Sequence, residues 1–180
     1  MILKLKSYIQ PTLINSWNNQ AEQQQSRAGL VGRDTENKQV RDCEIRSVSF
    51  NDVPDLYLSI SSVMLPVVDA HMSKFRVDIN RTLEIQHSTY HVGNFYSRHT
   101  DIGNARSIWS MPTSRKISIV IMATDPTEYE GGDLVIEGET MPKDKGTVVM
   151  FVPMMWHEVK PVTGGIRKSI VAWVHGPTWR

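Results

Sequence analysis

The stretch GTVVMFVPMMWHEVKPVTGGIRKSIVAWVHG, residues 146–176, decides the fold because it contains three β-favouring runs separated by turn residues. After Arg81 the preceding sequence has the same texture, in the runs TLEIQHSTYHV, KISIVIMA and GDLVIEG. No helical period of apolar residues persists in this half of the chain. Strands that recur at roughly ten-residue spacing predict an antiparallel sandwich or barrel.

Two helices are expected upstream of these strands. Residues 10–24 carry apolar side chains on one side at helical spacing, namely Leu13, Ile14, Trp17 and Ala21. Residues 51–68 repeat this amphipathic pattern. We expect Asn51 or Asp52 to cap the second helix and Pro66 to kink it.

The predicted fold is therefore mainly β, with N-terminal helices packed on one sheet. We expect a single domain over residues 1–180, with helical support in about 1–80 and the β core in about 81–177. The polar segment 25–42 between the helices contains two glycines and predicts a mobile connection whose tip reaches a ligand.

The composition of the chain narrows the range of possible functions. The chain has 20 Lys and Arg against 19 Asp and Glu, so no broad positive field favours nucleic acid or an anionic membrane. Cys43 is the only cysteine, so a metal site would have to use histidine and carboxylate ligands. No run suits a signal peptide or a membrane span, and we expect a soluble, cytoplasmic protein.

One short motif suggests a metal site. In YHVGNFYSRHTD, residues 90–101, His99 and Asp101 stand two positions apart and would share one face of a strand. His157 follows 58 positions after His99 (157 minus 99), beside another strand. Two histidines and one carboxylate on one face of a metal are typical of non-haem Fe(II) oxygenases. A lone histidine in a β protein is more often a surface or hydrogen-bonded residue.

A second motif suits a carboxylate ligand. Arg167 lies ten residues after His157 (167 minus 157), and Ser169 follows on the same face of the last strand. A guanidinium binds a carboxylate through two parallel hydrogen bonds. If a 2-oxo acid chelated the metal, a second carboxylate on the same molecule would reach Arg167. By itself Arg167 would more often be a surface strand residue.

Together these segments resemble a known family. The motifs FYSRHTD, EYEGGDLVIEG, MFVPMMWHEV and GGIRKSIVAWVHG resemble the 2-oxoglutarate and Fe(II)-dependent oxygenases of the prolyl 4-hydroxylase kind. They are especially similar to the bacterial PKHD-type hydroxylases. The resemblance covers about residues 80–177 and implies a double-stranded β-helix, or jelly roll.

The resemblance also implies a role for each matching residue. His99, Asp101 and His157 would be the catalytic iron ligands, while Arg167 would bind the 5-carboxylate of 2-oxoglutarate. The hydroxyl of Tyr90 would assist that carboxylate. Ser169 is expected to help.

Three further residues are expected near the substrate. By resemblance, Tyr96 lies beside cosubstrate and substrate, Trp173 lines the substrate pocket and Arg115 contacts a substrate peptide. Tyr96 and Trp173 would otherwise be simple packing residues. Gly131 and Gly132 are expected to allow a tight strand entry where a side chain would crowd the site.

The implied activity is hydroxylation of an unactivated C–H bond with Fe(II), 2-oxoglutarate and O₂, and with ascorbate as an accessory reductant. We expect a prolyl residue in a peptide or protein as substrate, and a free amino acid or small metabolite is the alternative. Relatives that repair nucleic acid carry arginine where this chain has Trp173, so no nucleic-acid substrate is expected. A catalytically silent metal-binding β-barrel module is the alternative from another class, and the oligomeric state stays open.

Overall fold

The computed structural model describes residues 1–31, 35–102 and 113–179. Its largest element is a seven-stranded antiparallel sheet, here called the major sheet. In spatial order the strands of the major sheet are β1 (Ile2–Leu5), β13 (Val148–Phe151), β9 (Thr113–Met122), β16 (Arg167–Pro177), β7 (Leu83–Tyr90), β6 (Glu44–Val48) and β2 (Arg27–Ala28).

A five-stranded antiparallel sheet, the minor sheet, faces it. Its strands are, in order, β12 (Glu139–Thr140), β11 (Leu134–Ile136), β14 (His157–Val159), β8 (Phe95–His99) and β5 (Arg41–Asp42). Two small ribbons pair β10 (Tyr129–Gly131) with β15 (Val162–Gly165) and β3 (Leu30–Val31) with β4 (Thr35–Glu36). The two facing sheets confirm the predicted jelly roll.

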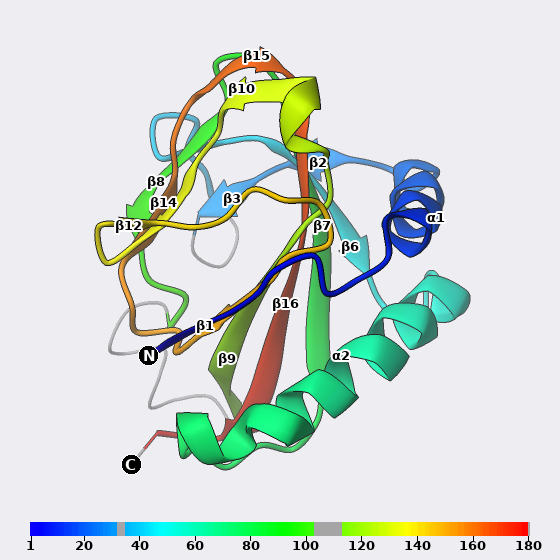
Figure 1. The fold of residues 1–180 in the computed structure, drawn as a ribbon, viewed down its shortest axis with the longest axis vertical. Helices are drawn as coiled ribbons and strands as arrows, with labels where there is room; N and C mark the ends of the chain where they lie inside the picture. The colour runs from blue at the N-terminus through cyan, green and yellow to red at the C-terminus, as the bar shows by residue number, and fades with distance from the viewer. Residues whose placement is uncertain (32–34, 103–112, 180) are drawn as a thin grey trace.

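The helices lie on the side of the major sheet that faces away from the minor sheet (Figure 1). They are α1 (Pro11–Glu22) and α2 (Pro54–Phe75), and a short 3₁₀ helix, η1 (Pro126–Glu128), precedes β10. The predicted apolar side of α1 is correct, since Ile14, Trp17 and Ala21 are buried. No helix among residues 1–31, 35–102 and 113–179 is long and apolar enough to cross a membrane.

Alternation along the strands produces two apolar cores. On β16, Ile170, Ala172 and Val174 pack with the helices. Residues of the opposite parity, beginning with Arg167, face the minor sheet, because successive strand side chains point to opposite faces. The second core lies between the sheets and includes Val120, Phe151 and Leu134.

The predicted cap of α2 is wrong. The N-cap is Val53, and Pro54 occupies the first turn, where its missing N–H costs no hydrogen bond. Asp52 instead belongs to the preceding turn, where its backbone N–H donates to the Ser49 hydroxyl (3.1 Å). The helix continues without interruption through Pro66 and ends at Phe75.

The first 80 residues supply more than helical support. Strand β1 pairs with β13 and strand β6 with β7, so both extend the major sheet. Segment 25–42, predicted as a connection, contributes β2 to the major sheet and β5 to the minor sheet. Residues 32–34 of this predicted loop lie outside the described residues.

Candidate metal centre

The three predicted metal ligands meet between the two sheets. His157 opens β14 and stands directly opposite His99, the last residue of the neighbouring strand β8. Asp101 lies in the turn after β8, not on the strand as the sequence suggested. The turn is fixed because the backbone N–H of Asp101 donates to the carbonyl oxygen of Pro153 (2.8 Å).

The ligand atoms are close enough to share one ion. One donor atom from each of the three residues lies within 4.8 Å of the other two. The Nε2 atom of His157 is 3.4 Å from Oδ2 of Asp101, and that of His99 is 3.6 Å from Oδ1. The hydroxyl of Ser118 donates to Oδ2 of Asp101 (2.7 Å) and orients the carboxylate.

Backbone carbonyls set the histidine tautomers. Nδ1 of His99 lies 2.8 Å from the oxygen of Ser97, and Nδ1 of His157 lies 2.9 Å from that of Met155. A carbonyl only accepts, so each Nδ1 carries the proton, and in a neutral ring Nε2 presents its lone pair. Two lone pairs and a carboxylate converging on one point are the donor set that suits a divalent iron ion.

The electrostatics agree with this assignment. Burial alone would raise the pKa of Asp101, but hydrogen bonds from His157 and His99, which Nε2 donates only when the imidazole is protonated and which a bound metal would replace, hold it well below its usual range. Burial lowers the pKa of His99. Burial also opposes protonation of His157, but its hydrogen bond with Asp101 raises its pKa. The centre therefore keeps a buried negative charge that a cation would compensate.

Arg167 lies deeper between the sheets, at the start of β16. It is 1% exposed, and its Nη1 donates to the hydroxyl of Ser169 (3.2 Å), as the sequence pairing suggested. Its other hydrogen-bond contacts in the described chain are Met122 Sδ (3.9 Å) and Tyr129, and none is acidic. A buried guanidinium without a carboxylate partner is a strong site for an anionic ligand.

Aromatic side chains and a glycine shape the space around Arg167. Tyr90 pairs with it in register, is buried, and has its ring centroid 5.1 Å from the guanidinium carbon. Gly132 has φ +60°, and a Cβ there would lie 2.8 Å from Cδ of Arg167, which confirms that a side chain would crowd the site. Tyr129 was missed by the sequence reasoning, although it stands two residues before Gly131 in EYEGG.

Arg41 is a second buried guanidinium that sequence reasoning missed. It lies over the ring of Tyr96 at 4.5 Å, and its Nε donates to Sγ of Cys43 (3.2 Å). The ring of Tyr96 in turn stacks on that of His99, with centroids 3.5 Å apart. Tyr96 thus lies beside the metal centre, and its contact with cosubstrate and substrate stays a prediction. Arg41 could not be predicted because it lies in the polar segment 25–42. No local pattern in that segment indicates that it pairs with β8.

Arg115 and Trp173, predicted to contact substrate, contact each other. Arg115 lies over the Trp173 ring at 3.7 Å and donates two hydrogen bonds to Glu84, Nε to Oε2 (3.0 Å) and Nη2 to Oε1 (2.6 Å). Burial alone would raise the pKa of Glu84, but the hydrogen bond from His175 and the charge of Arg115 lower it to about 2. The Arg115 guanidinium is therefore already held by a carboxylate.

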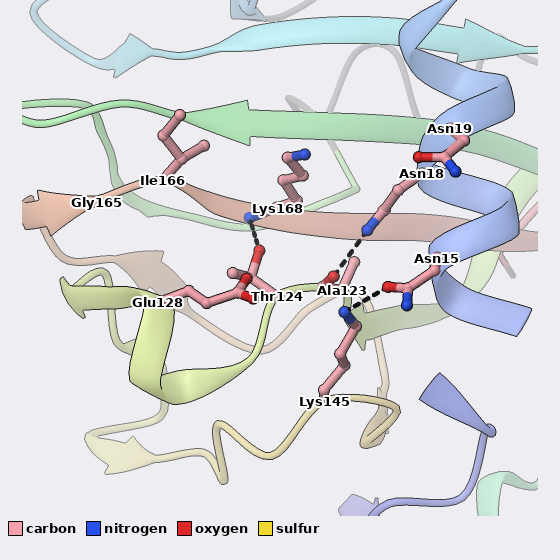
Figure 2. Close-up of a pocket in the computed structure, with 10 residues that line it drawn as sticks. All are labelled: Asn15, Asn18, Asn19, Ala123, Thr124, Glu128, Lys145, Gly165, Ile166 and Lys168. Carbon is pink, nitrogen blue, oxygen red and sulfur yellow. Dashed lines mark hydrogen bonds between the residues drawn. The ribbon is translucent and has the colours of Figure 1, made fainter. Parts of the chain in front are cut away.

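A separate polar cavity of about 680 Å³ lies on the helix side of the major sheet (Figure 2). Lys168, beside Arg167 in sequence but on the other face of β16, lines it together with the three asparagines of α1. The amide of Asn18 donates to the carbonyl oxygen of Ala123 (2.8 Å), and its Oδ1 is 3.1 Å from Nε2 of the buried His87. These contacts hold α1 against the major sheet, and they lie outside the metal centre.

Comparison with known proteins agrees with this geometry. Residues 85–175 match the 2OG-Fe(II) oxygenase superfamily, and the chain belongs to it. It is similar to a PKHD-type hydroxylase of Gloeothece citriformis, with 38% identity over 48% of this chain and 40% of the relative. A PKHD-type hydroxylase of Klebsiella pneumoniae is 32% identical over 66% of this chain and 55% of its own length. The chain thus spans about half the length of these curated relatives.

Solved structures show the same fold. A prolyl-4-hydroxylase of Pseudomonas putida has a TM-score of 0.76 at 17% identity, covering 96% of this chain and 91% of that one. A prolyl hydroxylase of Trichoplax adhaerens, solved in complex with a hypoxia inducible factor peptide fragment, has a TM-score of 0.72 at 15% identity, covering 96% and 82%. At such identities the likeness concerns the fold alone.

Proposed function

We propose that this protein is a dioxygenase that uses Fe(II), 2-oxoglutarate and O₂ to hydroxylate an unactivated C–H bond. The observation that carries the proposal is the pairing of two sites between the sheets. One is the cluster of His99, Asp101 and His157 within 4.8 Å, and the other is the buried Arg167 without an acidic partner in the described chain. A dicarboxylic 2-oxo acid is the ligand that links a metal to a guanidinium.

Each part of the site has a defined task. His99, Asp101 and His157 would hold iron on one side and leave its other positions open. When bound, the metal and its cosubstrate supply oxidation by O₂, with one oxygen atom entering the C–H bond and the other entering succinate as CO₂ leaves. Arg167 would bind the far carboxylate, supported by Ser169 and by the hydroxyls of Tyr90 and Tyr129.

The surrounding walls favour this chemistry because they exclude water. Phe151 is fully buried, and its ring centroid lies 4.8 Å from that of His157. Tyr96 covers one face of His99 at 3.5 Å. In a dry site the charge of Arg167 acts on a carboxylate more strongly than it would in water, so the cosubstrate is held in one orientation.

For the substrate we propose a prolyl residue in a peptide or protein. The support is the likeness in fold to prolyl hydroxylases, one of them solved with a peptide, and the stacking of Tyr96 on the ring of His99. A free amino acid or small metabolite is the competing substrate class, and nucleic acid is not proposed. Succinate release stimulated by proline-rich peptides and not by free proline would favour the first class; the reverse would favour the second.

We also propose a cytoplasmic, reducing setting, in keeping with the single buried Cys43, and ascorbate as the reductant that returns oxidised iron to Fe(II). Residues 1–180 would act as one domain, because strands from both halves of the chain share each sheet. Turnover that decays without ascorbate and recovers on its addition would support the reductant. Equal time courses with and without it would refute it.

The decisive experiment is anaerobic. Fe(II) is added to metal-free protein, 2-oxoglutarate is titrated, and the visible metal-to-ligand charge-transfer band of the chelate is recorded, with His157→Ala as the control. A saturable band in the unaltered protein alone would establish metal and cosubstrate together. Absence of the band from folded, iron-loaded protein would instead support a catalytically silent β-barrel module.

A further inference from the structure

Lys143 binds one short segment of the chain at three points. Its ammonium donates to the carbonyl oxygen of Gly131 (2.6 Å) and pairs with Oδ1 of Asp133 (3.2 Å). It also lies 4.6 Å from the ring centroid of Tyr129. An isolated ion pair at a protein surface contributes little to stability, but here one cation joins a backbone carbonyl, a carboxylate and an aromatic ring. Residues 129–133 are here called the glycine segment.

The glycine segment needs support from outside because its backbone is unusual. Gly131 and Gly132 both have positive φ, +68° and +60°, and the pairing of β10 with β15 shifts register between Glu130 and Gly131. Glycine samples many backbone conformations at low cost, so two in succession leave the position of the segment weakly determined by local forces. The N–H of Gly132 donates to the carbonyl oxygen of Pro161 (2.9 Å). Lys143 holds the neighbouring carbonyl.

The glycine segment also forms one wall of the buried guanidinium site. Tyr129 is 6% exposed, and its hydroxyl accepts a hydrogen bond from Arg167. Gly132 approaches the aliphatic part of the same arginine, since a Cβ there would lie 2.8 Å from Cδ. Lys143 thus contacts the ring of Tyr129, whereas Arg167 contacts its hydroxyl. A shift of the segment would move this hydroxyl away from the place where the cosubstrate carboxylate is proposed to bind.

We propose that Lys143 is a positioning residue for the cosubstrate: it holds the Tyr129 hydroxyl beside Arg167, so that both groups meet the far carboxylate of 2-oxoglutarate. The inference rests on the proposed function for the identity of that ligand. Groups already fixed in the bound geometry lose less freedom on binding, so the affinity gained in this way depends on the far carboxylate. Lys143 would thereby favour dicarboxylic over monocarboxylic 2-oxo acids.

The test compares two 2-oxo acids that chelate iron through the same groups. Pyruvate has the 2-oxo acid end of 2-oxoglutarate but no second carboxylate. Iron-loaded protein is titrated anaerobically with each acid, and the affinity is read from the visible charge-transfer band. We expect Lys143→Met, which keeps a long side chain without its charge, to bind 2-oxoglutarate about 3- to 10-fold more weakly and pyruvate equally well. Unchanged 2-oxoglutarate affinity, or an equal loss for both acids, would overturn the proposal.

Lys145→Met is the matched control. Lys145 lies two residues further along the chain (145 minus 143), but it donates to Oδ1 of Asn15 (2.6 Å) in the cavity on the helix side (Figure 2). Because the same charge is lost from the same connection, both affinities should stay as in the unaltered protein. A loss of 2-oxoglutarate affinity as large as that in Lys143→Met would mean that positive charge here attracts the ligand, and the positioning role would be wrong.

A double-mutant cycle tests whether Lys143 acts through Tyr129. Tyr129→Phe keeps the ring and removes the hydroxyl that Lys143 is proposed to position. In that background, Lys143→Met should change 2-oxoglutarate affinity by less than about 2-fold. An effect as large as in the unaltered protein would show that Lys143 acts by another route, and it would refute the positioning role.

The unaltered protein separates this inference from the proposed function. If no band forms with either acid in folded, iron-loaded protein, the proposed function fails and the inference fails with it. If the band forms with 2-oxoglutarate and Lys143→Met binds both acids as the unaltered protein does, only the role of Lys143 fails.

Discussion

The two faces of strand β16 differ completely in what they do, although their residues alternate along one chain segment. The face toward the helices carries Ile170, Ala172 and Val174, which are buried among apolar side chains. The face toward the minor sheet carries Arg167, Ser169 and Trp173, which are equally buried but polar or amphipathic. Burial therefore does not distinguish packing from function here. The distinguishing feature is a buried polar group that the protein leaves available to a ligand.

This contrast gives a simple expectation for mutagenesis. Changes on the inner face should alter ligand binding while the fold stays stable, and changes on the helix face should alter stability while ligand affinity stays constant. The reason is that the inner groups contact space reserved for ligands, whereas the outer groups hold the helices to the sheet. The following predictions test this division, beginning with the largest effect.

Removing a metal ligand should have the greatest consequence. His157→Ala leaves two donors and exposes the carboxylate of Asp101 without its closest histidine, so we expect loss of the charge-transfer band and of 2-oxoglutarate turnover. The measurement is the anaerobic titration with iron analysis of the protein. Full turnover in this variant would refute the ligand assignment. Trp156→Phe, next in sequence but exposed, should behave like the unaltered protein.

Loss of the buried guanidinium should come next. Arg167→Ala removes the charged partner proposed for the cosubstrate, a loss of roughly 2 to 5 kcal/mol, which is about 30-fold to several thousand-fold in affinity. The affinity is measured from the charge-transfer band as 2-oxoglutarate is titrated. Lys168→Ala is the matched control on the other face of β16, where Lys168 pairs with Glu22. Equal cosubstrate affinity in Arg167→Ala and Lys168→Ala would contradict the proposal that the inner face of β16 binds the ligand and the helix face does not.

A helix-face change should produce the opposite outcome. Ile170→Ala removes a buried side chain from the core beneath the helices, and we expect about 2 to 5 kcal/mol less stability because the cavity cannot fully collapse. Denaturant unfolding measures the loss, and the charge-transfer titration of the folded variant should give an unchanged 2-oxoglutarate affinity. A large change in cosubstrate affinity with little change in stability would contradict the comparison.

A buried histidine on the helix face should also make the folded protein less stable at acid pH. Burial lowers the pKa of His87 to about 4, from an ordinary value of 6.5, so between these values the unfolded chain binds a proton that the folded one does not. Stability should therefore fall by roughly 3 kcal/mol as the pH drops from 6.5 through 4. Urea unfolding across this range measures the slope. His87→Gln, which cannot titrate, should flatten it, and an equal slope in both proteins would exclude His87.

The smallest expected effect concerns the orientation of Asp101. Ser118→Ala removes the hydroxyl that donates to Oδ2, and we expect a loss of about 10- to 100-fold in Fe(II) affinity with little change in stability. Iron titration under anaerobic conditions measures it. Ser114→Ala, on the same strand, is the control and should bind iron normally. Unaltered affinity in Ser118→Ala would mean that the histidines alone orient the carboxylate.

The sequence alone determined the strands after Arg81, the two helices and the residues that meet at the metal centre, whereas strands β1, β2, β5 and β6 of the first 80 residues were not predicted. These features are encoded locally: alternation of apolar residues specifies a strand, helical spacing specifies a helix, and His99, Asp101 and His157 are recognisable by residue type and spacing. The prediction from this motif was wrong in one detail, because Asp101 lies in a turn after β8 and not on the strand. Its side chain reaches the histidines because the backbone bond to Pro153 fixes that turn.

Only the tertiary structure decided which side chains surround that centre. Arg41 reaches Tyr96 because β5 joins the edge of the minor sheet, and Tyr129 reaches Arg167 through a turn that Gly132 permits. Arg115 is held by Glu84, on a strand 31 residues away in sequence. Such contacts depend on strand order and register, which are set by packing over the whole chain and not by any short stretch of it.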